Sequence, residues 1–366
     1  MGLPDIVIEF SKKAVAAIQS GTLGVVGIIL KDTKNHGAMI LRGVDEVPDG
    51  ESAFTEANTA YIQRAFAGAP TKVIIYTLPQ DAENYNEAFK YFGAQKVNYM
   101  VGAPDISAEE AKLFATWIAG LRKNSIRRPV AVLPNTTGDN RAVVNFCVVN
   151  SSAEKKIMEG DTAYTEAEYC SRIAGLLAGL DLRVSATYKP LSELTQIPDA
   201  ENEEIDAAID AGKLVLYNDG ERIVIARGVN SLTTVTEVET EDLKKIKISA
   251  IQDLIESDIY STINSSYIGN YSNSYDNKCL LVTAIKGYLK GLEAAEGGKG
   301  YLKADSSNIE INVTKQKQYL ESIGVDCSTM TEQEIKEANT GSHVFLKGTI
   351  SILDAIEDVE LFINKE

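Results

Sequence analysis

The 366-residue sequence contains only two histidines and four cysteines, and these scarcities argue against several classes of enzyme. A Ser-His-Asp triad would have to use His36 or His343, and no GxSxG nucleophile elbow is present. The cysteines form no CxxC pair, so we expect them to be reduced and mostly buried rather than metal ligands or disulfide partners. They are Cys147, Cys170, Cys279 and Cys327.

Phosphate-binding and metal-binding motifs are also missing. There is no GxxxxGK[ST] loop, and Gly21, Gly24 and Gly27 are spaced GxxGxxG within or before a strand-like run, which favours tight backbone packing. The acidic residues between 199 and 206 lack the alternation and central glycine of a calcium loop, so they predict the start of a helix. No cofactor and no metal are therefore expected.

The charge and hydropathy of the chain exclude two kinds of partner. The formal net charge of -16 repels phosphate backbones, so nucleic-acid binding is not expected. No run approaches the roughly 18 apolar residues of a membrane span, and the opening MGLPDIVIEFSKK lacks the features of a secretory signal. We expect no membrane insertion, and folding in a bacterial cytoplasm.

Strand-like and helix-like segments alternate from about residue 21 to about residue 190. Capping boxes begin two of the helical patterns, at Ser107 and at Thr165. Asp219-Gly220 predicts a hairpin that adds an antiparallel edge. The order predicts an α/β domain with a mostly parallel mixed sheet. The nearly continuous apolar runs expected as its buried strands are 24–30, 72–78, 98–103, 129–134 and 143–149.

After about residue 236, the regular alternation of strand-like and helix-like segments gives way to longer helical patterns. Thr240 is expected to cap a helix over 241–260, and a tyrosine-rich loop separates it from a second helix over 279–295. Strand-like runs at 308–313 and 343–353 complete a predicted smaller α+β unit.

Both ends of the chain carry apolar segments that are typical of short strands. An unpaired terminal strand exposes backbone donors and acceptors, so it must either pair within its own chain or be donated to a neighbouring sheet. Donation at both ends would build an extended lattice rather than a closed dimer. The amino-terminal residues are Ile6, Val7, Ile8, Glu9 and Phe10, and the carboxy-terminal residues are Val359, Glu360, Leu361, Phe362 and Ile363.

Five segments, taken in order, resemble the contractile tail sheath family of myophages and R-type bacteriocins. The similarity spans nearly the whole chain, and its specificity lies in the order of the segments. They are GLPDIVIEFSKKAVAAIQSGTLGVVGIIL (2–30), YCSRIAGLLAGLDLRVSATYKPL (169–191), KLVLYNDGERIVIARGVNSLTT (213–234), DNKCLLVTAIKGYLKGLEAAEGG (276–298) and GSHVFLKGTISILDAIEDVELFI (341–363).

The resemblance implies a structural subunit without catalytic activity. Such subunits stack as hexameric rings around an inner tail tube, meet baseplate and tail terminator proteins, and contract to drive the tube through a cell envelope. The family's central domain is described as subtilisin-like in fold. Assembly in the bacterial cytoplasm would precede incorporation into a released phage or bacteriocin particle.

The resemblance also implies a division of the chain and a role for its ends. We expect an amino-terminal arm over 1–20, a sheath domain over 21–235, an α+β domain over 236–348 and a terminal strand and arm over 349–366. Both arms would donate strands to neighbouring copies. The predicted acceptor residues are Val344, Leu346, Ile350 and Ile352.

Two alternatives remain open at this point. The chain could be a cytoplasmic α/β enzyme or ligand-binding protein with its ends tucked into its own sheets. Lys244, Lys245 and Lys247 are expected to form a solvated helix face, or in a sheath to pair with acidic patches on a neighbour.

Overall fold

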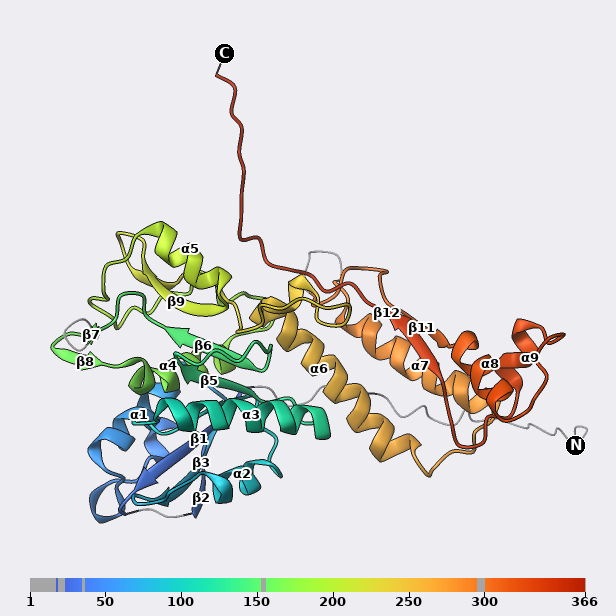
Figure 1. The fold of residues 1–366 in the computed structure, drawn as a ribbon, viewed down its shortest axis with the longest axis horizontal. Coiled ribbons are helices and arrows are strands. Elements are labelled where there is room, and N and C mark those ends of the chain that lie inside the picture. The colour runs from blue at the N-terminus through green and yellow to red at the C-terminus, as the bar shows by residue number, and fades with distance from the viewer. Residues whose placement is uncertain (1–17, 19–23, 35–36, 153–155, 295–299, 366) are drawn as a thin grey trace, which may run out of the picture. The chain divides into compact units, whose positions relative to one another are not determined.

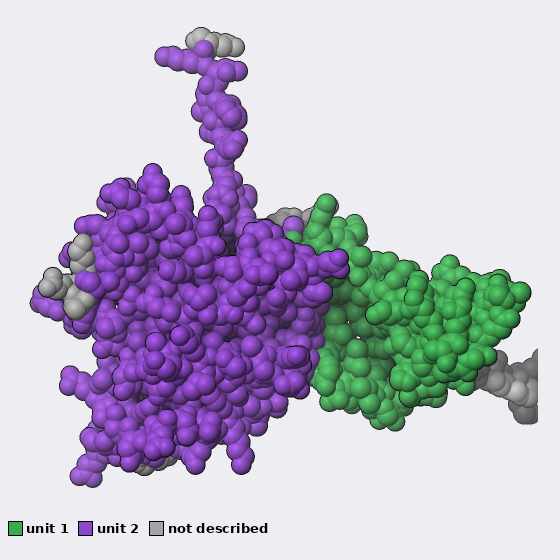
Figure 2. Space-filling view, viewed as in Figure 1, with its two compact units in different colours: residues 1–20, 258–352 green, residues 21–257, 353–366 purple. Residues whose placement is uncertain are grey.

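The computed structural model describes residue 18 and residues 24–34, 37–152, 156–294 and 300–365. Two compact units divide the chain (Figure 2). The larger unit comprises residues 21–257 with 353–366, and the smaller one contains residues 258–352.

An eight-stranded sheet forms the centre of the larger unit, in the order β10-β9-β6-β5-β4-β1-β3-β2 (Figure 1). All neighbours pair in parallel except β2 and β10, which are antiparallel edges. The mostly parallel sheet and the hairpin at Asp219-Gly220 are confirmed, whereas the edge strand β2 was not predicted. The strands are β1 (Val25–Asp32), β2 (Gly37–Leu41), β3 (Lys72–Pro79), β4 (Tyr99–Val101), β5 (Val130–Pro134), β6 (Val143–Cys147), β9 (Lys213–Asn218) and β10 (Ile223–Ile225). A separate small hairpin joins β7 (Ile157–Glu159) to β8 (Thr162–Tyr164).

Helices cover both faces of this sheet. Ile28 of β1 belongs to the core beneath α1 (Glu56–Phe66) and α4 (Glu166–Gly179). Its neighbour Ile29 belongs to the core beneath α2 (Asn86–Phe92) and α3 (Ala108–Asn124). Since successive side chains of a strand point to opposite faces, a strand buried on both sides must be apolar throughout. This explains the continuous apolar runs.

Side-chain caps begin the helices where the sequence predicted them. Ser107 and Thr165 both form complete capping boxes, with glutamates three residues later. The acidic stretch from 199 is also a helix start, because the Glu204 carboxylate accepts the backbone N–H of Glu201 at the amino-terminal end of α5 (Asn202–Asp210). The interpretation of this cluster as a helix start is confirmed.

The α1–α4 contact depends on glycine. A Cβ on Gly175 would lie 1.9 Å from the carbonyl oxygen of Ala65, and one on Gly179 would lie 1.8 Å from that of Gly68. The two glycines are four residues apart and therefore lie on one face of α4, where the backbones of the two helices touch. Any larger side chain there would have to push the helices apart.

Glycine also explains the GxxGxxG spacing. Gly24 has a φ of 87°, and a Cβ on Gly27 would lie 2.9 Å from the Phe92 ring. Both positions serve backbone conformation and packing, as predicted. Gly21 lies outside the described residues.

The smaller unit is built from helices and one hairpin. Its elements are the end of α6 (Ile246–Thr262), a π-helical turn (Ile263–Tyr267), α7 (Tyr275–Leu292), β11 (Asn308–Ile311), α8 (Val313–Ser322), α9 (Glu332–Glu337) and β12 (Leu346–Thr349). The helices α8 and α9 were not predicted.

The single helix predicted over 241–260 is wrong at its start. Residues Glu241–Lys244 form a 3-10 turn, Lys245 is extended with a ψ of 126°, and α6 begins at Ile246. The Thr240 side chain bonds to the Asp242 carboxylate instead of capping a backbone N–H. Because Lys245 is not helical, its side chain does not share one helix face with Lys244 and Lys247.

Candidate assembly interface

The carboxy-terminal segment has the alternation of a strand but no strand partner in the described part of the chain. Val359, Leu361 and Ile363 are 76%, 75% and 79% exposed, and Phe362 is 89% exposed. In an extended chain the three aliphatic residues would share one face, opposite Glu360. Figure 2 shows the segment as a thin extension of the larger unit. Exposed apolar residues in such a row mark a surface that another chain can cover.

The amino-terminal candidates cannot be placed in the same way. The residues predicted to form the first arm, Ile6 to Phe10, lie outside the described residues. Their role as a donated strand stays a prediction.

The hairpin of the smaller unit has one open backbone edge. The N–H of Asn312 donates to the carbonyl of Phe345, so the odd-numbered residues of β12 bond toward β11. The backbone groups of Leu346 and Gly348 therefore point away from β11. Among the described residues, no other strand joins β12 on that side. A two-stranded sheet is marginally stable by itself, and this edge is free to accept a third strand.

The predicted acceptor residues lie on this hairpin and its continuation, although the strand is shorter than expected. Only Leu346 belongs to β12, whereas Val344 precedes it and Ile350 and Ile352 follow it. Ile352 forms an isolated bridge to Leu302, and Val344 and Ile350 are exposed. Strand alternation would place all four residues on one face only if the strand extended from 344 to 352, whereas the strand itself ends at Thr349.

Packing across the hairpin fixes one position on that face. A Cβ on Gly348 would lie 2.1 Å from Cδ1 of Ile309, so the Ile309 side chain occupies the space above the glycine. This contact makes the apolar face continuous from β11 to β12, which sequence reasoning missed because it depends on the pairing register.

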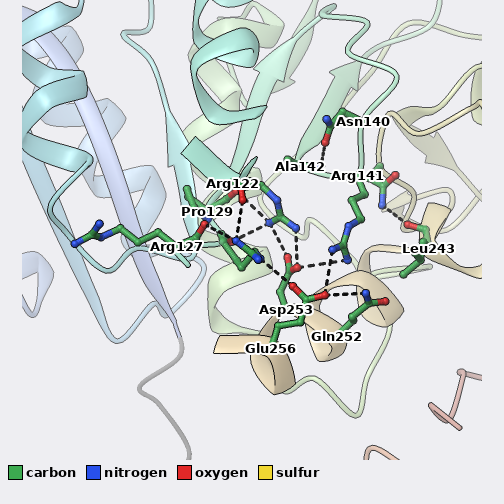
Figure 3. Close-up of polar contacts among 12 residues, drawn as sticks. Arg122, Arg127, Pro129, Asn140, Arg141, Ala142, Leu243, Gln252, Asp253 and Glu256 are labelled. Carbon is green, nitrogen blue, oxygen red and sulfur yellow. Dashed lines mark hydrogen bonds and ion pairs between the residues drawn. The ribbon is translucent and has the colours of Figure 1, made fainter. Parts of the chain in front are cut away.

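A cluster of buried and half-buried ion pairs holds the first turns of α6 within the larger unit (Figure 3). Arg122 donates two hydrogen bonds to Asp253, at 2.7 and 2.6 Å, and both side chains are less than 10% exposed. Arg141 lies 3.4 Å from Asp253 and 3.5 Å from Glu256, and Arg128 donates to Glu256 at 2.9 Å. Three arginines thus fix two carboxylates one helical turn apart.

The charge balance of this cluster favours the ionised form of Glu256. Burial would raise the pKa of Glu256, but hydrogen bonds from Gln252 and Arg128 and the charge of Arg141 hold it below its usual value. No local pattern predicts this cluster, because each arginine lies more than 100 residues from its carboxylate partner along the chain.

The three lysines near the start of α6 do not form one solvated face. Lys244 pairs with Glu241 at 2.8 Å, and Lys245 pairs with Asp354 and Glu357 of the same chain. The side chain of Lys247 is buried. The predicted solvated face is therefore wrong for Lys245 and Lys247, because the carboxy-terminal segment returns to this surface.

Asp32, at the carboxyl end of β1, is a buried carboxylate with a structural role. The Asp32 carboxylate accepts hydrogen bonds from the N–H and hydroxyl of Thr55 and from the amide of Asn58, all between 2.8 and 2.9 Å. Burial would raise the pKa of Asp32, but these donors together lower it. The carboxylate is engaged in fastening the β1 loop to α1.

The cysteines and histidines, which are the remaining candidates for a nucleophile or a base, also have structural surroundings. Burial raises the pKa of Cys147 to about 11, which keeps the thiol protonated at neutral pH. His343 packs against Tyr319 and Phe345 in the smaller unit, and His36 lies outside the described residues. All four cysteines are free, as predicted.

Within the described ranges, no group of three His, Cys, Asp or Glu side chains is arranged to hold a metal ion. None of the described helices is long and apolar enough to cross a membrane.

Comparison with known proteins agrees with this picture. Residues 80–231 match the family model for the phage tail sheath protein central domain. The chain is 36% identical over 368 residues to the tail sheath protein of Clostridium phage phiCD119, covering 98% of both. Its fold is similar to that of the sheath tail protein from Desulfitobacterium hafniense, with 16% identity, a TM-score of 0.68 and coverage of 84% of this chain and 94% of that one. It is also similar to the PVC sheath of an extracellular contractile injection system in the contracted state, with 12% identity, a TM-score of 0.66 and coverage of 100% and 98%.

The agreement extends over nearly the full length of a relative and includes both structural units. By sequence, this chain belongs to the phage tail sheath protein family, and its fold agrees with that of a solved sheath tail protein.

Proposed function

We propose that the chain polymerises by strand donation and forms a sheath that contracts around an inner tail tube. Residues 359–363 would add to the open edge of β12 in a neighbouring copy, and residues 6–10 would be the second donated strand. Hexameric rings would stack in this way, with baseplate and tail terminator proteins at the two ends. Assembly would take place in the bacterial cytoplasm before release of the particle.

One observation carries the proposal: the chain contains both halves of a strand-addition joint, and neither half is used internally by the described residues. The donor offers exposed Val359, Leu361 and Ile363. The acceptor offers the outward backbone groups of Leu346 and Gly348. Each ladder hydrogen bond would contribute about 0.5–1.5 kcal/mol net, and the burial of aliphatic side chains would add to it.

Two features support a one-shot mechanical role. The arms are continuous with the folded units, so links between copies would persist while the folded units move past one another. The similar PVC sheath is known in a contracted state. A small free-energy gain per subunit would add up over many coupled copies.

Truncation at residue 358 tests the proposal. Electron microscopy should show tubes or rings for the full chain and dispersed particles for the truncated chain. Circular dichroism and thermal unfolding of the two proteins should agree, since the removed side chains are exposed. Polymers of normal abundance from the truncated chain would contradict donation by this arm.

A further inference from the structure

We propose that residues 354–358 form a clasp that fastens the root of the carboxy-terminal arm to its own chain and so sets the length of strand free for donation. This inference rests on the proposed function. It concerns the acidic stretch before the donated strand, and it assigns a role to side chains of the larger unit that are distant in sequence.

Glu357 is the centre of the clasp. Its side chain is only 5% exposed, although the apolar residue beside it, Ile356, is 90% exposed. The hydroxyls of Ser185 and Thr187 each donate to the same oxygen, Oε1, at 2.7 Å. The segment is therefore held by polar contacts and not by burial of Ile356.

Backbone N–H groups of the larger unit orient the two hydroxyls. Ser185 Oγ accepts the backbone N–H of Thr187, and Thr187 Oγ1 accepts the backbone N–H of Gly228. A hydroxyl has one proton, so Ser185 can donate it either to Glu357 or to Oγ1 of Thr187, which lies 3.0 Å away, whereas the proton of Thr187 is available to the Glu357 carboxylate. Hydrogen bonds to a charged acceptor are among the stronger ones in proteins.

Basic groups of the larger unit meet the remaining carboxylates. Lys245 pairs with Asp354 and lies 3.4 Å from Oε2 of Glu357. Arg227 pairs with Asp358 at the far end of the segment. Burial alone would lower the pKa of Lys245, but its two acidic partners raise it. Acidic residues at three positions of the segment thus each have a cationic partner.

The clasp changes how far the arm can extend. Ile352 is held by its bridge to Leu302, so a chain released from the clasp would be free from residue 353 onward. With the clasp closed, the free part begins at Val359. At about 3.3 Å per extended residue, the six residues 353–358 correspond to about 20 Å of reach. A closed clasp would therefore restrict which neighbouring edge the strand can meet.

A glutamate-specific protease tests the clasp on the full-length monomer. Cleavage after the exposed Glu360 serves as the internal standard for cleavage after Glu357. Lys245→Ala should speed cleavage after Glu357, relative to Glu360, by about tenfold. Lys244→Ala is the matched control, since its partner is Glu241 and not the arm. Equal ratios in Lys245→Ala and Lys244→Ala would overturn the clasp.

A second variant keeps the proposal testable if Lys245→Ala does not fold. Arg227→Ala removes the partner of Asp358 at the opposite end, and it should raise the same ratio by severalfold with an unchanged thermal midpoint. If both variants fold like the original chain and neither changes the ratio, the clasp is wrong.

Polymerisation assays distinguish the role of the clasp from strand donation itself. Lys245→Ala should still polymerise through its arm, but should give tubes at least severalfold less uniform in ring spacing than Lys244→Ala. Uniform tubes from Lys245→Ala would reject the control of reach while leaving donation intact. Normal polymers from the chain truncated at 358 would instead reject donation.

Discussion

The guanidinium of Arg122, in the last turns of α3, donates two hydrogen bonds to the carboxylate of Asp253 in α6, and both side chains are almost fully buried. The pair joins elements that are 131 residues apart in sequence. Removing one member of such a pair leaves the other charge buried without its partner, which costs more than the pair contributes. The first turns of α6 therefore depend on this contact for their position.

Asp253→Ala should lower the free energy of unfolding by about 3–5 kcal/mol, because Arg122 would stay buried without its carboxylate. Chemical denaturation of the monomer measures this. The control is Asp206→Ala, at an exposed position of α5, which should change stability by less than about 0.5 kcal/mol. Equal effects at the two sites would contradict the assigned role of Asp253.

Gly175→Ala should destabilise the larger unit by about 1–3 kcal/mol or more, since the new methyl group would meet the backbone of α1. Gly120→Ala offers a matched helical control, because a Cβ there has nothing within 4 Å. It should be neutral or stabilise by up to about 1 kcal/mol. Thermal unfolding of both variants would show opposite or unequal shifts, and a neutral Gly175→Ala would mean that α1 and α4 can separate freely.

The alternation of the arm gives a prediction at the level of single residues. Leu361→Ser should weaken polymerisation by an order of magnitude or more in critical concentration, because a buried leucine contributes about 1.5–3 kcal/mol. Glu360→Ser, at the adjacent exposed position, should have a much smaller effect. Sedimentation of the polymers measures both. A larger effect of Glu360→Ser would show that the opposite face of the arm meets the acceptor.

Acid should destabilise the protein through carboxylates whose pKa is lowered by folding. The pKa of Glu256 in the folded chain lies below its usual 4.5, so the unfolded chain binds the proton more readily. Its contribution is present above about pH 4.5 and is lost as the pH falls toward the folded value. Unfolding measured between pH 6 and pH 3 should show this loss, and Glu256→Gln should make the curve less steep. An unchanged slope would assign the acid sensitivity to other groups, such as Asp32.

Local patterns were sufficient for much of the larger unit. Capping boxes at Ser107 and Thr165, the Asp219-Gly220 turn and the apolar strands all depend on neighbours in sequence, and all were predicted correctly. Errors occurred where a local pattern competed with distant contacts. The helix expected from Thr240 is interrupted at Lys245, whose side chain binds the returning carboxy-terminal segment.

Residue type and spacing were sufficient to predict the alternating α/β order, the absence of familiar catalytic motifs and the apolar character of the chain ends, because each of these is a local property of the sequence. Tertiary contacts were needed to establish which carboxylates pair with which basic groups, and which backbone edge of β12 has no partner among the described residues. Those outcomes depend on pairing register and on contacts between residues such as Ser185 and Glu357, which are 172 positions apart. No periodicity in the sequence encodes such a contact, since it exists only when the sheet and its helices have brought the two positions together.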